Sequence, residues 1–217
     1  MDRVIDIVLP AIPQTLVMVI ASTIISLLIG LPLGIILTTT RPGGLTESTK
    51  VYSILDGIIN ILRSFPFVIL MIVVFPLSRL IVGKSYGTAA MIIPLSVSAA
   101  PFVARLMEGY FIQVDSGIIE AAKSMGSSKR EIIFKVLIPE AMPMIVTGIT
   151  MTIINVIGYS AMAGVMGGGG LGDVANRYGY QRNEPLILWS AVIVIIILVQ
   201  IVQFVGNLLT KKIDKRK

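Results

Sequence analysis

The protein has 217 residues, a formal net charge of +6, 55% hydrophobic and 14% charged residues, and a mean hydropathy of +0.91. Soluble domains contain about 45–50% apolar and about 25% charged residues, so this composition excludes an ordinary soluble protein and indicates an integral membrane protein. The chain contains neither cysteine nor histidine. Disulfides, thiolate sites and the Ser-His-Asp triad are therefore excluded, and we expect no metal site and no catalytic residues.

Charge-free stretches of sequence mark the expected membrane-spanning segments. A helix needs about 20 apolar residues to cross the hydrocarbon core. Four stretches are long enough alone, and Ser64–Ser78 becomes long enough when it is extended back toward Val51. The sequence therefore predicts an all-α polytopic membrane protein with five transmembrane helices in one domain, residues 12–208. The expected helices are 13–39, 54–79, 87–110, 140–164 and 186–208.

The distribution of lysine and arginine predicts the orientation of these spans. The two residue types gather in the connections after the first and third expected helices and in the C-terminal tail 211–217. Arg105 is counted with the connection after the third helix, and Arg63 is taken as intramembrane. By the positive-inside rule these connections lie in the cytoplasm, so the N-terminus is expected outside and the C-terminus inside. The positive charge is then explained by anchoring to anionic membrane lipid, and nucleic acid is not an expected partner.

The longest expected cytoplasmic connection, 112–138, contains the signals of two short helices. Asp115 or Ser116 can cap the first helix, and Gly126 can end it in a left-handed turn. Ser128–Glu131 has the pattern of a capping box that begins a second helix. The segment is therefore predicted to be a helix, a glycine turn and a helix lying across the cytoplasmic surface.

The spacing of Ile118, Ala122 and Met125 predicts that these residues form one apolar face of the first short helix. Two interpretations of such a face are open. The helix can rest on lipid headgroups, or it can insert into a groove of a partner protein. Pattern alone does not separate the two.

The same segment resembles a known signature. Glu120-Ala121-Ala122, then Gly126, then Val136–Pro139, is similar to the EAA signature of binding-protein-dependent ABC transporter permeases, with a conservative departure in the last four residues. The resemblance implies a type I ABC importer transmembrane fold, in which this segment is a coupling helix that docks into a cytoplasmic ATPase. The residues implied in ATPase coupling are Glu120, Ala121, Ala122, Met125 and Gly126.

Two further segments resemble a narrower group. Arg63–Phe67 is similar to the Arg-Ser-x-Pro-Phe motif of amino-acid permeases, and Gly158–Gly164 with the glycine run after it looks very like the methionine-uptake permeases. The resemblance implies a homodimer of this subunit in the bacterial cytoplasmic (inner) membrane, two ABC ATPase subunits that hold ATP and Mg, and an extracytoplasmic methionine-binding lipoprotein. A permease for another amino acid or an osmolyte is the alternative, and the preference for D- or L-methionine is left open.

Candidate residues for a substrate pathway lie on the fourth expected helix. Met151, Asn155, Tyr159 and Met162 are spaced so that they form one stripe, and Ser160 lies in the same segment. Soft thioethers with a few polar groups would let an amphipathic amino acid pass without trapping it. Ordinary filling of the core by methionine is the alternative interpretation.

A polar stripe is also expected on the second span, where Asp56, Asn60 and Arg63 are spaced at i, i+4 and i+7. Ionisable groups at membrane depth normally face the bundle interior and pair with one another. The spacing favours a structural Asp56–Arg63 ion pair over direct contact with substrate.

The chain itself is expected to be a transport subunit and not an enzyme. Gly83-Lys84-Ser85 looks like the end of a phosphate-binding loop, but the position of its first glycine is occupied by Ser78. ATP hydrolysis is therefore expected on another polypeptide, and no cofactor is expected on this chain. An ion-coupled carrier is less favoured, because five spans with one coupling segment show no inverted repeat.

Overall fold

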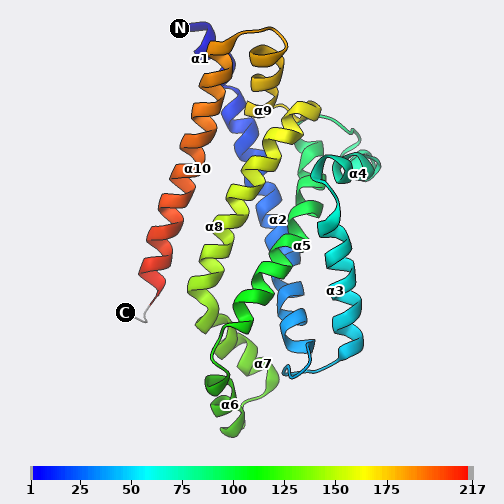
Figure 1. Ribbon diagram of the computed structural model, residues 1–217, viewed down its shortest axis with the longest axis vertical. Coiled ribbons are helices and arrows are strands. Elements are labelled where there is room, and N and C mark those ends of the chain that lie inside the picture. Colours follow the sequence, from blue (N-terminus) through cyan, green and yellow to red (C-terminus); the bar gives the residue numbers. More distant parts are fainter. Residues whose placement is uncertain (1, 215–217) are drawn as a thin grey trace.

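The computed structural model describes residues 2–214, and all regular elements within that range are helical. Five of the helices run side by side along the length of the molecule (Figure 1). They are α2 (Ala11–Thr40), α3 (Thr49–Ser64), α5 (Thr88–Ile112), α8 (Ile138–Ala163) and α10 (Pro185–Ile213). By length and composition, four helices can cross a membrane, and a fifth span is added if α3 and the helix after it are counted together.

Short elements lie at the two ends of this bundle or cross it. They are α1 (Asp2–Val8), α4 (Phe67–Val82), α6 (Ser116–Ser124), α7 (Lys129–Glu131), η1 (Ile132–Leu137), η2 (Gly164–Gly168), α9 (Gly170–Val174) and η3 (Ala175–Tyr180). Figure 1 shows α6 and α7 at one end and α1 and α9 at the other. The C-terminal end of α10 points toward the α6 end. Lys215, Arg216 and Lys217, which support the predicted orientation, lie outside the described residues.

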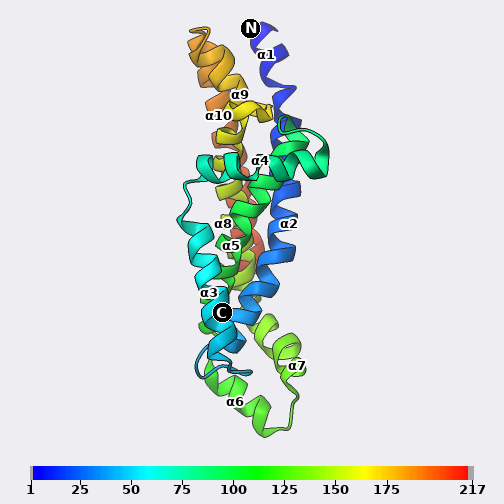
Figure 2. The same cartoon turned by 90° about the vertical axis from the view of Figure 1, so that its right-hand side faces the viewer.

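The second span differs from the prediction of one continuous helix over 54–79. It is divided into α3 and α4, which meet at 108°, and Figure 2 shows α4 crossing the other helices. The break falls at Phe65 (φ −70°, ψ 129°), directly before Pro66. A proline disfavours helical backbone in the residue before it and offers no N–H to continue the helix. The apolar run of α4 was extended back through Arg63 and Asp56 as one predicted span, and the prediction therefore did not indicate the corner.

Close approach of α2 and α5 forms the centre of the bundle. A Cβ atom on Gly30 would lie 2.6 Å from the Val103 Cβ, and one on Gly34 would lie 2.7 Å from the Met107 Cβ. Val103 and Met107 are fully buried. Small residues therefore let the two backbones approach, which is how helices associate in a membrane that supplies no hydrophobic driving force between them.

The backbone is irregular where the glycine run follows α8. Within η2, Met166 and Gly167 leave helical φ/ψ, and Gly167, Gly169 and Gly170 all have positive φ. The freed polar groups find partners outside the run: the Gly170 N–H donates to Gln14 Oε1 at 2.7 Å. The Leu171 N–H donates to Thr15 Oγ1 at 2.9 Å. Side chains of α2 thus supply the N-terminal cap of α9 that a glycine cannot provide.

Candidate functional site

The segment between α5 and α8 has the predicted helix, glycine turn and helix. Asp115 caps α6, since its Oδ1 accepts a hydrogen bond from the Gly117 N–H at 2.8 Å. Gly126 has φ +82°, and its N–H donates to the Lys123 carbonyl at 2.9 Å. A Cβ atom on Gly126 would meet nothing within 4 Å, so the left-handed backbone and not crowding requires glycine here.

The second helix of the segment begins with the predicted capping box. The Glu131 N–H donates to Ser128 Oγ at 3.3 Å, and the Ser128 N–H donates to Glu131 Oε2 at 3.1 Å. Lys135 Nζ lies 3.0 Å from Glu131 Oε1 and extends this local network by one turn. The path from the capping box through η1 into α8 is an unbroken run of helical residues.

The predicted apolar face of α6 is only partly formed, because two of its three residues are exposed. Ala122 is buried against the bundle, but Ile118 is 39% exposed and Met125 is 79% exposed. Met125 lies past the last helical residue and is the C-cap, so it leaves the helical wheel. Ile119 packs instead against the core cluster that contains Phe111. Two apolar side chains are therefore presented outward.

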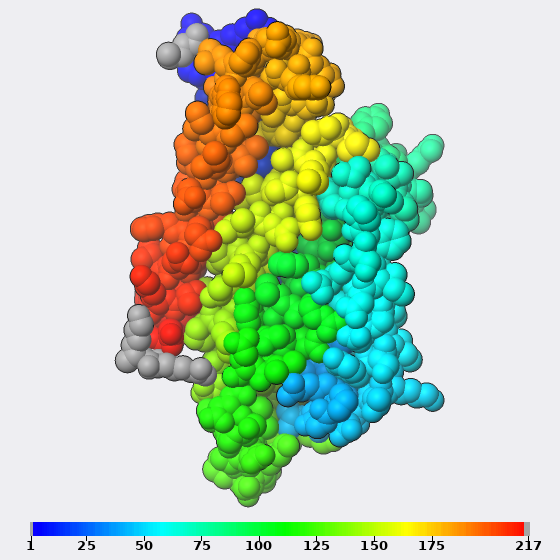
Figure 3. All heavy atoms as spheres, viewed as in Figure 1, coloured from blue at the N-terminus to red at the C-terminus, as the bar shows by residue number. Residues whose placement is uncertain are grey.

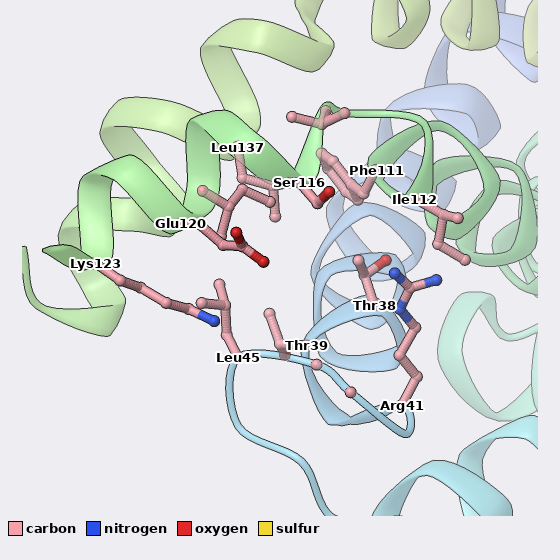
Figure 4. A pocket seen from close by; sticks show the side chains of 14 residues that line it. Thr38, Thr39, Arg41, Leu45, Phe111, Ile112, Ser116, Glu120, Lys123 and Leu137 are labelled. Atoms are coloured by element: carbon pink, nitrogen blue, oxygen red, sulfur yellow. The ribbon is translucent and has the colours of Figure 1, made fainter.

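The remaining residues of the signature also lie at this end of the molecule. Ala121 and Gly126 are exposed. Glu120 is exposed as well, and its carboxylate points from α6 toward the turn that follows α2 (Figure 4). In the space-filling view the α6 end projects beyond the other helices (Figure 3). The Glu120–Gly126 part of the signature thus lies on a short and mostly exposed element at one end of the molecule.

The polar cluster of α3 has a different partner from the predicted one. Arg105 on α5 donates to Asp56 and, at 3.0 Å, to Asn60 Oδ1. It also donates to Glu108 Oε2 at 2.6 Å. The Asp56–Arg63 pair is therefore not formed, because Arg105 lies within α5 and faces α3, although its charge was counted with the connection that follows the helix.

Two residues of this cluster, Arg105 and Glu108, were not identified as members of it from the sequence. Their opposite charges at i, i+3 on one helix are the signal that identifies them as intramembrane partners. Glu108 is only 3% exposed, and Arg105 supplies it with a charged partner on the same helix. Arg63 is exposed and borders a hollow of about 280 Å³ together with Arg105 and Tyr110.

The predicted stripe on α8 is partly formed. Met151 and Met162 are both 48% exposed, and Asn155 between them is half-buried. Tyr159 is half-buried too, and its ring stacks on Phe67 with 4.5 Å between centroids. Ser160 does not belong to the stripe: it is buried and donates to the Ile157 carbonyl at 2.7 Å.

Two aromatic residues near this stripe were not among the sequence candidates. The Tyr110 hydroxyl lies 3.7 Å from Met151 Sδ. Phe67 is the last residue of the Arg63–Phe67 motif and stacks on α8 from the far side of the α3–α4 corner. Both contacts join segments distant in sequence, so no local pattern indicates them.

These features define a multi-pass helical membrane protein with a broken second span and a projecting helix–glycine–helix element. Residues 30–217 match the family described as binding-protein-dependent transport system inner membrane component. The chain belongs to this family, and it is accordingly a multi-pass protein of the bacterial inner membrane.

Relatives of the same family are similar along nearly the whole chain. The probable D-methionine transport system permease protein MetI of Vibrio cholerae is 46% identical, over 97% of this chain and 94% of its own. The methionine import system permease protein MetP of Bacillus subtilis is 45% identical, over 83% of this chain and 82% of its own.

A solved structure agrees with this assignment. The native crystal form of the inward-facing MetNI methionine ABC transporter contains a chain that superposes with a TM-score of 0.97 at 38% identity. The superposition covers 99% of this chain and 100% of that one. The predicted importer transmembrane fold is confirmed.

Proposed function

We propose that this protein is the transmembrane subunit of an ATP-driven importer that carries methionine across the cytoplasmic membrane. The observation that carries the proposal is the full-length similarity, in sequence and in fold, to permeases named for methionine import. The projecting α6 element supports it, because a chain without a complete phosphate-binding loop needs a contact through which a separate ATPase can act.

In this proposal α6 is the contact with the ATPase. Ala121, Met125 and Gly126 are exposed at the end of the bundle, where a groove of a partner can accept them. Ala122 instead packs on the bundle and holds α6 in place. Because the element is joined to α5 on one side and to α8 on the other, motion of the ATPase is transmitted to both spans as a rigid-body rotation. ATP and Mg are held by the ATPase.

The proposed assembly is a homodimer with two ATPase subunits and an extracytoplasmic methionine-binding lipoprotein. A two-fold pair places the same α8 face of each subunit toward a shared axial path. Met151 and Met162 are exposed on this face and Asn155 between them is half-buried, and the two thioethers suit an amphipathic amino acid. The N-terminus and the α9 end then face outward and α6 faces the cytoplasm, with 12–208 as the transporting domain.

The test is transport by the reconstituted complex. The subunit, its ATPase and its binding protein are placed in proteoliposomes, and uptake of radiolabelled L- and D-methionine is followed with and without ATP. We expect uptake of at least one isomer that requires ATP and all three proteins. Absence of ATP-dependent uptake of both isomers, from complexes that hydrolyse ATP, would overturn the substrate assignment.

A further inference from the structure

A polar cavity of about 340 Å³ lies between α6 and the turn that follows α2 (Figure 4). Its apolar floor is formed by Phe111 and Leu137, which are both 1% exposed. Charged side chains reach it from two segments distant in sequence: Arg41 from the turn, and Glu120 and Lys123 from α6. The cavity therefore contains both signs of charge above a hydrophobic base.

The three charged side chains have no partner among the described residues. No ion pair or side-chain hydrogen bond joins Arg41, Glu120 or Lys123 to another residue within 2–214. The Arg41 Nε is moreover buried without an acceptor. Buried donors in folded proteins are nearly always satisfied, so an unbonded guanidinium nitrogen at a cavity wall indicates a missing acceptor.

The two threonines of the cavity can only accept hydrogen bonds from a ligand. Thr38 Oγ1 already donates to the Gly34 carbonyl at 2.9 Å, and Thr39 Oγ1 donates to the Ile35 carbonyl at 2.9 Å. Their hydroxyl protons are thus used, and their oxygens retain free lone pairs. A cation with N–H donors is the group that such oxygens and the Glu120 carboxylate attract.

We infer that this cavity binds a small zwitterion, with its anionic oxygens at Arg41 and its ammonium group at Glu120 and the threonine oxygens. A simple anion would leave the Glu120 carboxylate without a partner, and a simple cation would leave Arg41 without one. A free amino acid and the headgroup of an ethanolamine phospholipid share this chemistry. The site is separate from the proposed path on α8, and its existence does not rest on the proposed function.

A ligand in this position would join α6 to the turn after α2. The only protein contacts needed are those to side chains already facing the cavity in Figure 4. Charge-assisted hydrogen bonds at both ends would then restrict movement of the element that carries Glu120. Occupancy of the site is therefore expected to stiffen the connection between α5 and α8.

The experiment is native mass spectrometry of the assembled complex. Complexes are released from nanodiscs of phosphatidylethanolamine or of phosphatidylcholine, and in a second arm they are incubated with L-methionine or with its N-trimethylated derivative. We expect an adduct from one of the two ammonium ligands, since methylation removes the N–H donors that Glu120 requires. The mass of the adduct identifies its source as a lipid or an amino acid.

Variants assign the adduct to the cavity. Arg41→Met and Glu120→Gln should each lower its occupancy about tenfold, the loss expected for one charge-assisted hydrogen bond. Lys50→Met is the matched control, because Lys50 is exposed and does not line the cavity, and it should leave the occupancy unchanged. Absence of any adduct, equal binding of trimethylated ligands, or an adduct unaffected by both cavity variants would overturn the site. None of these outcomes depends on transport.

Discussion

At the α6 end, the turn between two helices is made by residues of one short segment, whereas at the α9 end the break is held by residues from other helices. Asp115, Gly126 and Ser128 each act on backbone within three residues of their own position. The Gly167 carbonyl instead accepts from the Gly87 N–H at 2.8 Å, and the Gly170 N–H donates to Gln14. One end is specified locally, and the other only when the whole bundle is assembled.

This difference predicts which substitutions damage the fold and which affect only contacts with partners. At the α9 end Gly170 and Gly172 are buried and closely surrounded, so an added side chain has no space there. At the α6 end an added side chain or an unbonded amide would be exposed. Substitutions of the same type should therefore cost more stability at the α9 end than at the α6 end.

The largest expected effect is that of Gly172→Val. A Cβ atom on Gly172 would lie 2.1 Å from the Ala161 carbonyl oxygen, which is backbone and cannot move aside. We expect a loss of about 3 kcal/mol or more in the free energy of unfolding, with little protein recovered as a single species. Thermal unfolding in detergent after size-exclusion chromatography measures this. A melting temperature equal to that of Gly126→Val would contradict the contrast between the two ends.

The next effect is that of Arg105→Met, which leaves Asp56 and Glu108 without their cation. We expect a loss of about 2–3 kcal/mol, less than for a fully buried ion pair because the Arg105 side chain keeps 24% of its exposure. Arg63→Met is the control and should cost under about 0.5 kcal/mol, as for other exposed positions. The same unfolding measurement applies. An equal loss of stability for both variants would contradict the assignment of Arg105, and not Arg63, as the partner of Asp56.

The Arg105 cluster also shows where sequence reasoning reaches its limit. Charge-free runs locate α2, α5, α8 and α10 because burial in lipid requires long uncharged helices. The same rule assigned Arg105 to a connection, since it takes no account of charges neutralised inside the bundle. The corner at Pro66 was missed for a different reason: the short apolar run after it was extended back through Arg63 to reach the length of a span, and the effect of proline on the preceding backbone was not considered.

The local structure of the segment 112–138 was predicted almost completely, and the candidate path only in part. Caps and glycine turns are decided by near neighbours, so Asp115 and Gly126 could be assigned from the sequence. The outward position of Met125 was missed because the helix ends one residue earlier. On α8, helical periodicity placed Met151 and Met162 correctly on one exposed face, but the neighbour Ser160 faces the core.

A smaller effect is expected from Gln14→Leu. The variant removes the acceptor of the Gly170 N–H, and leaving a buried donor unsatisfied costs about 1–3 kcal/mol. Gln113→Leu is the matched control, because its amide donates to the Gly109 carbonyl at an exposed site. Comparison of the two melting temperatures gives the measurement. If Gln113→Leu is the more damaging variant, the α9 end is not held by α2.

Gly126→Val should act on partners more than on the fold. A side chain at φ +82° is strained by about 1–2 kcal/mol, although nothing would contact the added Cβ. We expect an inserted, dimeric protein that retains less ATPase during co-purification and transports less methionine. Gly109→Val, on a glycine that is also open but helical, is the control for added bulk. Full retention of the ATPase by Gly126→Val would show that the glycine turn is not needed for attachment of the ATPase.

The smallest intrinsic effect is that of Glu120→Lys, and it decides between the two interpretations of the segment. Reversing the charge in the first half of α6 costs about 0.3–1 kcal/mol, which leaves the fold intact. If α6 rests on anionic headgroups, a lysine there is accepted and uptake is unchanged. If α6 docks on the ATPase, co-purified ATPase and methionine uptake should both fall, at membrane expression matched to the unaltered protein. Glu120→Gln separates charge reversal from loss of the carboxylate: it should lower the occupancy of the cavity beside Arg41 about tenfold while retaining more of the ATPase than Glu120→Lys. Full uptake and full ATPase retention in Glu120→Lys and Gly126→Val together would remove the coupling role from α6.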